Sequence, residues 1–237
     1  MAAHTIQGVL ATSHEDSLVI SKQRVSDHGE VLTGTREVNA MLDLVKSETQ
    51  RIESRFLEPA CGNGNFLAEI LGRKLAVVES RYARSQLDYE RNAVLAVCSI
   101  YGIDIQEDNV AACRARLFAI FDQRYTARFE ASAKEECRDA VRYVLERNII
   151  HGDALSLKTL GEVQHPIIFS EWSAPFNNSL LKRRDFTFSE LLQGGETPQQ
   201  SLFDRAVYSD LGQRAFIPKE LVSYPLIHFL KVREHDE

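Results

Sequence analysis

Residues 56–67 constrain the fold more than any other stretch of the chain. They read Phe-Leu-Glu-Pro-Ala-Cys-Gly-Asn-Gly-Asn-Phe-Leu, and a helical pattern continues to Leu71. This order predicts a short strand, a turn with two glycines and a helix. Glycine permits φ > 0 and lets a ligand approach the backbone closely. Since a helix N-terminus offers unpaired N–H groups and a partial positive charge, the stretch predicts a site for a nucleotide-type ligand.

Strands and helices alternate along the rest of the chain. This alternation predicts an α/β fold with a doubly wound, mostly parallel sheet. The expected strands lie near residues 55–58, 99–104, 148–154 and 166–170. The expected helices lie near residues 36–46 (capped by Thr33 or Thr35), 65–73, 79–97 (an extra helical insertion), 109–122 and 130–147.

The composition is that of a globular protein, with 44% hydrophobic and 26% charged residues. The longest apolar runs, such as residues 93–97, are too short to span a membrane, and the N-terminus lacks the layout of a secretory signal. The four cysteines have no Cys-x-x-Cys spacing, so the sequence predicts no metal site and no disulfide framework. We therefore expect a cytoplasmic protein. Its expected parts are an N-terminal arm (residues 1–27), a ligand-binding domain (28–192) and a C-terminal tail (193–237).

The glycine turn also resembles a known motif. Motif I of the S-adenosylmethionine-dependent DNA adenine-N6 methyltransferases reads Asp/Glu-Pro-Ala-Cys-Gly-x-Gly-x-Phe/Leu. Seven residues fill this pattern without a gap: Glu58, Pro59, Ala60, Cys61, Gly62, Gly64 and Phe66. The resemblance implies a Rossmann-like sheet of the class I methyltransferase type, in which these residues and Asn65 bind S-adenosyl-L-methionine. The alternative is an ordinary strand, turn and helix with incidental glycines.

Acidic residues end the second and third expected strands. In the resembled family, the residue at the position of Asp104 binds the ribose hydroxyls of the cofactor, with Ile105 beside it. The Gly-Asp-Ala pattern at Asp153 and Ala154 resembles the motif whose carboxylate accepts from the amino group of the cofactor adenine. The alternatives are a surface acid that caps a helix at Asp104 and a turn aspartate that bonds its own backbone at Asp153.

An upstream stretch resembles a third family motif. Residues 28–33 read His-Gly-Glu-Val-Leu-Thr, similar to Gly-x-Val/Phe-Phe-Thr-Pro, which helps to hold the methionine end of the cofactor. The resemblance assigns Thr33 to the cofactor site. The match is partial because Gly34 stands where the family has proline, and a plain helix cap is the alternative.

The fourth family motif is altered in this chain. The family carries Asp/Asn/Ser-Pro-Pro-Tyr/Phe/Trp after the fourth strand, where the polar residue accepts from the target amino group and the aromatic stacks on the flipped base. Here the chain has Ser170, Glu171 and Trp172, with no Pro-Pro pair and one residue fewer. The resemblance makes these three the candidate catalytic residues. Trp172 is equally compatible with a place in the core.

Two further features concern partners. The formal net charge of −6 argues against DNA binding by bulk electrostatics, and little chain follows Ser170, so we expect DNA recognition through a separate specificity subunit. The basic cluster at residues 182–184 either contacts phosphates or is a solvated charge run. Gln199–Phe203 resembles the bacterial sliding-clamp-binding pentapeptide Gln-x-Ser/Asp-Leu-Phe.

Together, these features predict an S-adenosylmethionine-dependent DNA adenine-N6 methyltransferase of the restriction–modification type. Two alternatives stay open. One is a non-catalytic, cofactor-binding regulatory or scaffold subunit, which the lost Pro-Pro pair favours. The other is a methyltransferase for RNA or for protein, because related sheets serve those substrates.

Overall fold

The computed structural model describes residues 33–176, 178–193, 207–208, 214–215 and 218–236. The helices are α2 (Thr35–Asp43), α3 (Lys46–Thr49), α4 (Asn65–Tyr82), α5 (Gln86–Cys98), α6 (Glu107–Phe129), η1 (Glu130–Ser132), α7 (Glu135–Asn148), α8 (Phe188–Gln193) and η2 (Phe229–Asp236). The strands are β1 (Phe56–Glu58), β2 (Ile100–Asp104), β3 (Ile149–Asp153), β4 (Lys158–Thr159), β5 (Ile168–Ser173), β6 (Leu180–Thr187), β7 (Val207–Tyr208), β8 (Arg214–Ala215), β9 (Val222–Ser223) and β10 (Ile227–His228). The expected arm at residues 1–27 and the Gln199–Phe203 segment lie outside the described residues.

A mostly parallel sheet forms the first half of the molecule and confirms the α/β class. Its strand order is β1-β2-β3-β4, with β1, β2 and β3 parallel and β4 antiparallel to β3. All five residues of the central strand β2 are buried. Each parallel strand ends in an acidic residue, Glu58, Asp104 and Asp153 in turn. The predicted strand ends therefore lie along one edge of the sheet.

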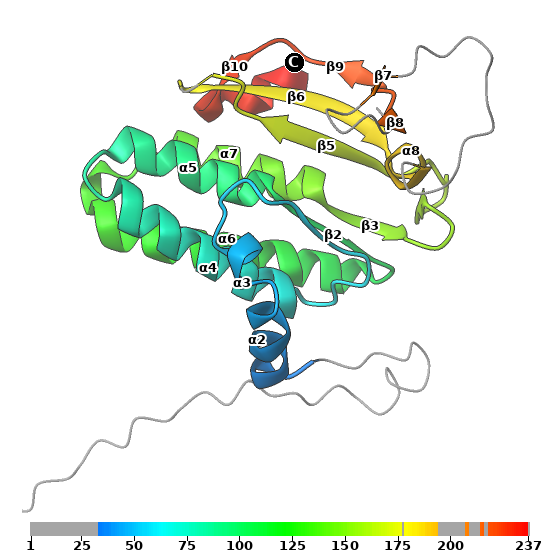
Figure 1. Cartoon of the computed structure of the whole chain (residues 1–237), viewed down its shortest axis with the longest axis horizontal. Helices are drawn as coiled ribbons and strands as arrows, with labels where there is room; N and C mark the ends of the chain where they lie inside the picture. Colours follow the sequence, from blue (N-terminus) through cyan, green and yellow to red (C-terminus); the bar gives the residue numbers. More distant parts are fainter. Residues whose placement is uncertain (1–32, 177, 194–206, 209–213, 216–217, 237) are drawn as a thin grey trace, which may run out of the picture.

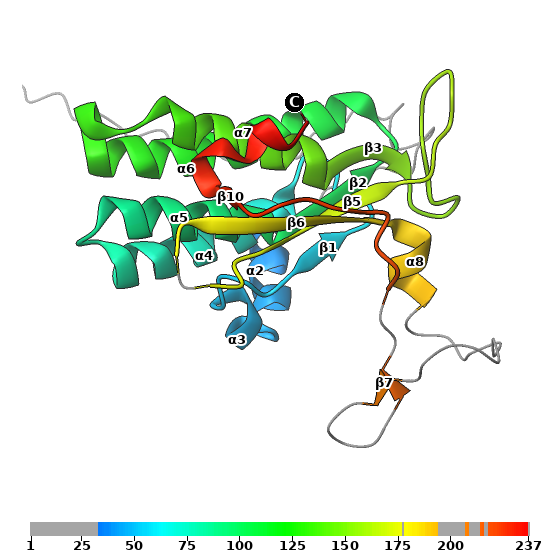
Figure 2. The same ribbon diagram turned by 90° about the horizontal axis from the view of Figure 1, so that it is seen from above.

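Four long helices build the core beside this sheet (Figures 1 and 2). Helix α4 packs against α5 and α6, and α7 packs against the same two helices. Leu67, Leu71, Leu75 and Val78 of α4 are at most 1% exposed and recur at helical spacing on one face. This apolar face, rather than the glycine turn alone, fixes α4 against the rest of the domain.

Several predicted helix limits are wrong. Helix α4 runs through Tyr82, so the predicted helix 79–97 is two helices separated at residues 83–85. The second of them starts at Ser85, whose Oγ accepts a hydrogen bond from the backbone N–H of Asp88 (3.2 Å). Helix α2 begins after Gly34, which caps it without a side-chain bond, so neither Thr33 nor Thr35 is its cap.

The predicted fourth strand does not join the parallel sheet. Strand β5 pairs antiparallel with β6, from Ile168 opposite Thr187 to Ser173 opposite Lys182, and β6 also pairs with β9 and β10. Only residues 174–179 connect β5 to β6. A connection this short joins antiparallel neighbours, because a parallel pair needs a crossover of a dozen or more residues. Figure 1 shows this second sheet over the helices and the parallel strands.

A buried arginine organises the second sheet. Arg183 of β6 is 2% exposed and donates to both carboxylate oxygens of Asp185 (2.8 and 2.7 Å). It also donates to Asp236 of η2 (2.9 Å) and to the hydroxyl of Tyr143 on α7 (2.6 Å). The network thus ties the C-terminal 3₁₀ helix and α7 to β6. The interpretation of residues 182–184 as one basic cluster is wrong, since Arg183 is buried and paired and Arg184 is paired with Glu171.

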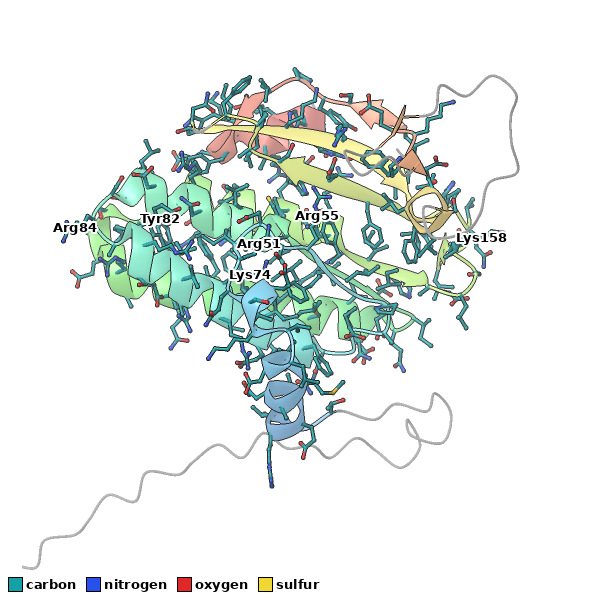
Figure 3. The ribbon with its side chains drawn as sticks, viewed as in Figure 1. Arg51, Arg55, Lys74, Tyr82, Arg84 and Lys158 are labelled. Atoms are coloured by element: carbon teal, nitrogen blue, oxygen red, sulfur yellow. The ribbon has the colours of Figure 1, made fainter. Side chains whose placement is uncertain are left out.

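A buried lysine fixes the chain just before β1. The ammonium of Lys74 donates to the carbonyls of Arg51 (3.1 Å), Ile52 (2.9 Å) and Ser54. Burial lowers the pKa of Lys74 to about 7. Figure 3 labels Lys74, Arg51 and Arg55 in neighbouring positions of the view, consistent with the bond from Lys74 to the carbonyl of Arg51. Lys74 thereby fixes the backbone immediately before Arg55, the residue that precedes β1.

In the described part of the chain, none of the helices is long and apolar enough to cross a bilayer.

Candidate functional site

The turn after β1 uses both glycines in left-handed backbone conformations. Gly62 has φ 51° and Gly64 has φ 86°, and Gly64 is the N-cap residue of α4. A Cβ atom on Gly64 would lie 2.7 Å from the Sγ of Cys113 on α6, so side chains are excluded there by packing as well as by φ. The backbone N–H of Cys61 donates to the carbonyl of Ile103 (2.9 Å) and anchors the turn to β2. The turn is therefore bonded to β2 and packed against α6 at the N-terminus of α4.

Asp104 joins the end of β2 to this turn. Its side chain is largely buried, with the residue 8% exposed. Oδ2 accepts from the backbone N–H of Gly62 (2.8 Å), and Oδ1 accepts from the backbone N–H of Gln106 (2.9 Å) and from Nδ2 of Asn109 (3.3 Å). Next to it, Ile105 is 49% exposed. The structure thus places a carboxylate and an exposed apolar side chain directly beside the glycine turn.

Asp153 ends β3 and bonds to its own turn. Its carboxylate accepts from the backbone N–H groups of Leu155 (2.9 Å) and Ser156 (3.3 Å). These contacts, first that of Leu155, hold the pKa of Asp153 below its usual range. The ring Nε2 of His151 lies 3.1 Å from the carbonyl oxygen of Ile105, which links the ends of β3 and β2. Asp153 and Ala154 follow at the same edge of the sheet as Asp104.

Thr33 also meets the glycine turn. Its carbonyl accepts from Nδ2 of Asn65 (3.0 Å), the first residue of α4. The other side of this amide, Oδ1, accepts from Arg116 of α6 (2.5 Å). A cavity of about 280 Å³ lies beside Asn65 and Arg116, between α2, α4 and α6. Arg116 was not among the predicted site residues, although its spacing of three from Cys113 places it on the helix face that meets the turn.

Glu58 is the last residue of β1 and leads into the turn. It is half-buried, and burial raises the pKa of its carboxyl above the usual value. Pro59 and Ala60 are exposed, whereas Phe66 packs against the core of the domain. Of the predicted cofactor residues, Asp104 is thus bonded to Gly62 of the turn and Thr33 to Asn65, the first residue of α4. Ile105 follows Asp104 directly in the chain.

The three candidate catalytic residues point to two faces of β5. Ser170 is 2% exposed and its hydroxyl donates to Asp185 (2.8 Å), while the indole Nε1–H of Trp172 donates to Oδ1 of Asn148 (3.1 Å). Trp172 is 4% exposed and belongs to the main core cluster. Glu171, which alternates with them, bonds to Arg55 at the start of β1 (2.5 Å). Of the three side chains, only that of Glu171 lies on the face of β5 that is turned toward β1.

A cavity of about 390 Å³ lies between the two sheets, on the face of Glu171. Its walls carry four aromatic residues, Phe56, Tyr101, Phe169 and Phe186, and it is also lined by Arg55, Leu57, Ser170, Glu171 and Arg184. Because Leu57 lines the cavity and Glu58 follows it in β1, the cavity starts next to the glycine turn. Arg55 and Tyr101 were not among the predicted site residues, since no local pattern shows that β1 and β5 face each other, and Arg184 was predicted only as part of the basic cluster at residues 182–184.

Comparison with known proteins identifies one family. The model of the family described as MmeI, DNA-methyltransferase domain, matches residues 33–166, which is more than half of the chain. The matched region runs from α2 through the parallel sheet and ends just before β5. Neither the curated proteins nor the solved structures contain a match to this chain.

Proposed function

Because the chain belongs to the MmeI DNA-methyltransferase domain family, a restriction–modification methylase family, we propose that it transfers a methyl group from S-adenosyl-L-methionine to the N6 amino group of adenine in DNA. The observation that carries the proposal is the turn at the end of β1. Gly62 and Gly64 adopt left-handed conformations there, and Gly62 is bonded to the strand-end carboxylate of Asp104.

The residues around the turn fit the proposed cofactor in their chemistry. A carboxylate offers about four lone-pair sites, of which Asp104 uses three here, so it keeps capacity for a ribose hydroxyl. Asp153 would accept from the adenine amino group, and the exposed side chain of Ile105 would cover the base. Thr33 and Asn65, bonded to each other at the turn, would hold the methionine end. When bound, the cofactor would supply the methyl group of its sulfonium and leave as the neutral thioether, and the methylated amino group would release one proton.

We place the methyl acceptor in the cavity beside Glu171. The aromatic walls suit a planar base, and Glu171 offers a carboxylate to an exocyclic amino group. Ser170 would contribute through its backbone, because its hydroxyl is engaged with Asp185, and Trp172 would support β5 from the opposite face. The work of the protein is then to orient the amino group and to exclude water from it.

A second candidate is a cofactor-binding subunit without catalytic activity. The buried contacts of the Ser170 hydroxyl and the Trp172 ring favour it, because neither group is presented to the cavity as the family motif would require. In this case the subunit would bind the cofactor and leave methyl transfer to a partner chain.

The experiment that separates these candidates is methyl transfer from radiolabelled cofactor to DNA, RNA and protein. Transfer to adenine N6 in DNA, located by digestion and chromatography, supports the proposal. Cofactor binding without transfer to any acceptor supports the second candidate. Label only in RNA or in protein would overturn the DNA assignment and support a methyltransferase for that acceptor.

Partners form a separate part of the proposal. The net charge of −6 supports DNA recognition through another, specificity-determining subunit. Docking of Gln199–Phe203 on a sliding clamp would raise the effective concentration of a weak DNA binder. A peptide of residues 194–208 should bind the clamp, and the same peptide with Leu202 and Phe203 changed to Ala should not. Equal or absent binding of both peptides would refute the docking.

A further inference from the structure

Two arginines share one carboxylate at the cavity between the sheets. Nη2 of Arg55 donates to Oε1 of Glu171 (2.5 Å), and Nη2 of Arg184 pairs with Oε2. Arg184 stands directly opposite Glu171 in the β5–β6 register. Each oxygen of Glu171 is therefore paired with a different guanidinium, and the carboxylate keeps further acceptor capacity. We call these three residues the Arg-Glu-Arg cluster.

The cluster carries a surplus positive charge. One arginine is enough to neutralise Glu171, so the second leaves a net charge of about +1, against a formal charge of −6 for the whole chain. The second arginine is not required as a bridge between the sheets, because the hydroxyl of Tyr101 on β2 already donates to the backbone carbonyl of Ser170 on β5 (3.0 Å). The charge surplus suits an anionic ligand better than it suits a purely structural contact.

The cluster lies at the outer end of the cavity. The side chains of Arg55 and Arg184 are 52% and 40% exposed, whereas that of Glu171 is 17% exposed. The wall residues behind them are nearly inaccessible, with Tyr101 at 7% and Phe169 at 3%. A ligand in the cavity would thus have an apolar, aromatic inner part and a charged outer part facing the guanidiniums.

The aromatic walls define the inner part of such a ligand. The rings of Tyr101 and Phe169 meet edge to face, 5.4 Å between centroids and 82° apart. The guanidinium of Arg184 lies 5.5 Å from the centroid of Phe186, so this arginine packs on one aromatic wall of the cavity. A volume of about 390 Å³ falls in the usual range for small-molecule sites. A flat heterocycle fits these walls, and a phosphate suits the planar donor fork of arginine.

We propose that Arg55 and Arg184 bind the phosphate of the nucleotide whose base enters the cavity. This inference rests on the proposed function, in which the cavity receives the acceptor base. It makes the ligand a nucleotide rather than a nucleoside, with Glu171 holding both guanidiniums in position until the phosphate arrives. The phosphate comes either from a free nucleotide or from a DNA strand, and the two sources differ in what is attached to it.

The test is calorimetric binding of deoxyadenosine, of dAMP and of a short single-stranded oligonucleotide to the full chain. We expect dAMP or the oligonucleotide to bind at least about tenfold more tightly than deoxyadenosine, and the preference to weaken with salt. Arg55→Ala and Arg184→Ala should each remove most of this preference. Arg51→Ala is the matched control, because Arg51 is 58% exposed, pairs with Glu48 and lies outside the lining of the cavity.

Glu171→Gln should change the phosphate preference in the direction opposite to the two arginine variants. Loss of the carboxylate raises the charge of the cluster, so the preference for dAMP and the oligonucleotide over deoxyadenosine should increase relative to the unmodified chain. A purely structural ion-pair cluster would leave this preference unchanged in Glu171→Gln and in the two arginine variants. Thermal unfolding of each variant identifies any that fails to fold, and the remaining variants still decide the outcome.

The inferred phosphate binding and the proposed methyl transfer can be refuted independently. If methyl transfer to DNA occurs while Arg55→Ala and Arg184→Ala bind nucleotide like Arg51→Ala, the inference is refuted and the proposed function stands. If phosphate-dependent binding follows the cluster but no methyl transfer occurs, the inference stands alone. Cluster-dependent binding of the oligonucleotide without dAMP binding identifies the DNA strand as the source, and binding of both extends the site to free nucleotides.

Discussion

The family-matched region, residues 33–166, and the second sheet after it are held together by different kinds of contact. The first is built on the apolar faces of four long helices and on three parallel strands. The second is organised by Arg183, a buried charge with acidic partners on β6 and η2. Both regions share one apolar core, to which Trp172, Leu181 and Phe229 contribute. The difference teaches that helical periodicity makes the first region readable in the sequence, whereas the second region also depends on an arginine that looks solvent-exposed in the sequence.

The strongest test of this difference removes the buried charge. Arg183→Met should lower the free energy of unfolding by about 3–5 kcal/mol, because the buried carboxylate of Asp185 would lose its partner and Asp236 would lose one of its donors. Chemical denaturation measures the change. Lys182→Met, at the preceding and more exposed position, should change stability by less than about 0.5 kcal/mol. Equal effects of the two changes would contradict the organising role of Arg183.

A smaller effect is expected from the glycine turn of the first region. Gly64→Ala should destabilise the domain by about 1–3 kcal/mol, because residue 64 has φ 86° and its Cβ would lie 2.7 Å from Cys113. Gly72→Ala is the control, since a Cβ there comes no closer than 3.9 Å to Arg124 within a helix, where alanine is favoured. Cys113→Ala should relieve part of the Gly64→Ala penalty. A neutral Gly64→Ala variant would mean that the turn is not constrained as described.

The smallest effect concerns pH and again falls on the second sheet. Burial raises the pKa of Asp236, but hydrogen bonds from Tyr143 and Arg183 outweigh it and lower the pKa overall. A lowered carboxyl pKa gives stability that is present above the unfolded pKa and is lost as pH falls through the folded pKa. The contribution is at most about 1 kcal/mol, because the side chain is about one third exposed.

Denaturation across the acidic range, from about pH 5 down to pH 2, checks this effect. Asp236→Asn should show a shallower loss of stability than the unmodified chain over that range. An identical pH profile for the two would rule out a contribution from Asp236.

The parts of the fold that sequence predicted depend on local signals. The turn after β1 was predicted because glycine spacing directly reports backbone conformation, and Asp104 because it ends an apolar strand. The break between α4 and α5 was missed, although Ser85 with Asp88 three residues later is a readable start signal. Such errors concern boundaries and leave the order of elements intact.

The second sheet could not be predicted from the same signals. An apolar run such as Ile167–Phe169 shows that a strand forms but not which strand it pairs with. Strand β5 pairs with its sequence neighbour β6, but the bonds that fix this pair to the rest of the molecule, Glu171 with Arg55 and Arg183 with Tyr143, join residues far apart in the sequence. The cavity between the sheets was missed for the same reason, because its lining comes from β1, β2, β5 and β6.

The most direct test of the account is calorimetric titration of the full chain with S-adenosyl-L-methionine. We expect saturable binding that Gly62→Val abolishes. Asp104→Ala should weaken it by about 1.5–3 kcal/mol, because a charge-assisted hydrogen-bond acceptor at the end of β2 is lost. Asp108→Ala, the same change on the first turn of α6, should bind the cofactor as the unmodified chain does. Absence of binding at millimolar cofactor, or equal affinity of the Asp104 and Asp108 variants, would contradict the assignment of the turn.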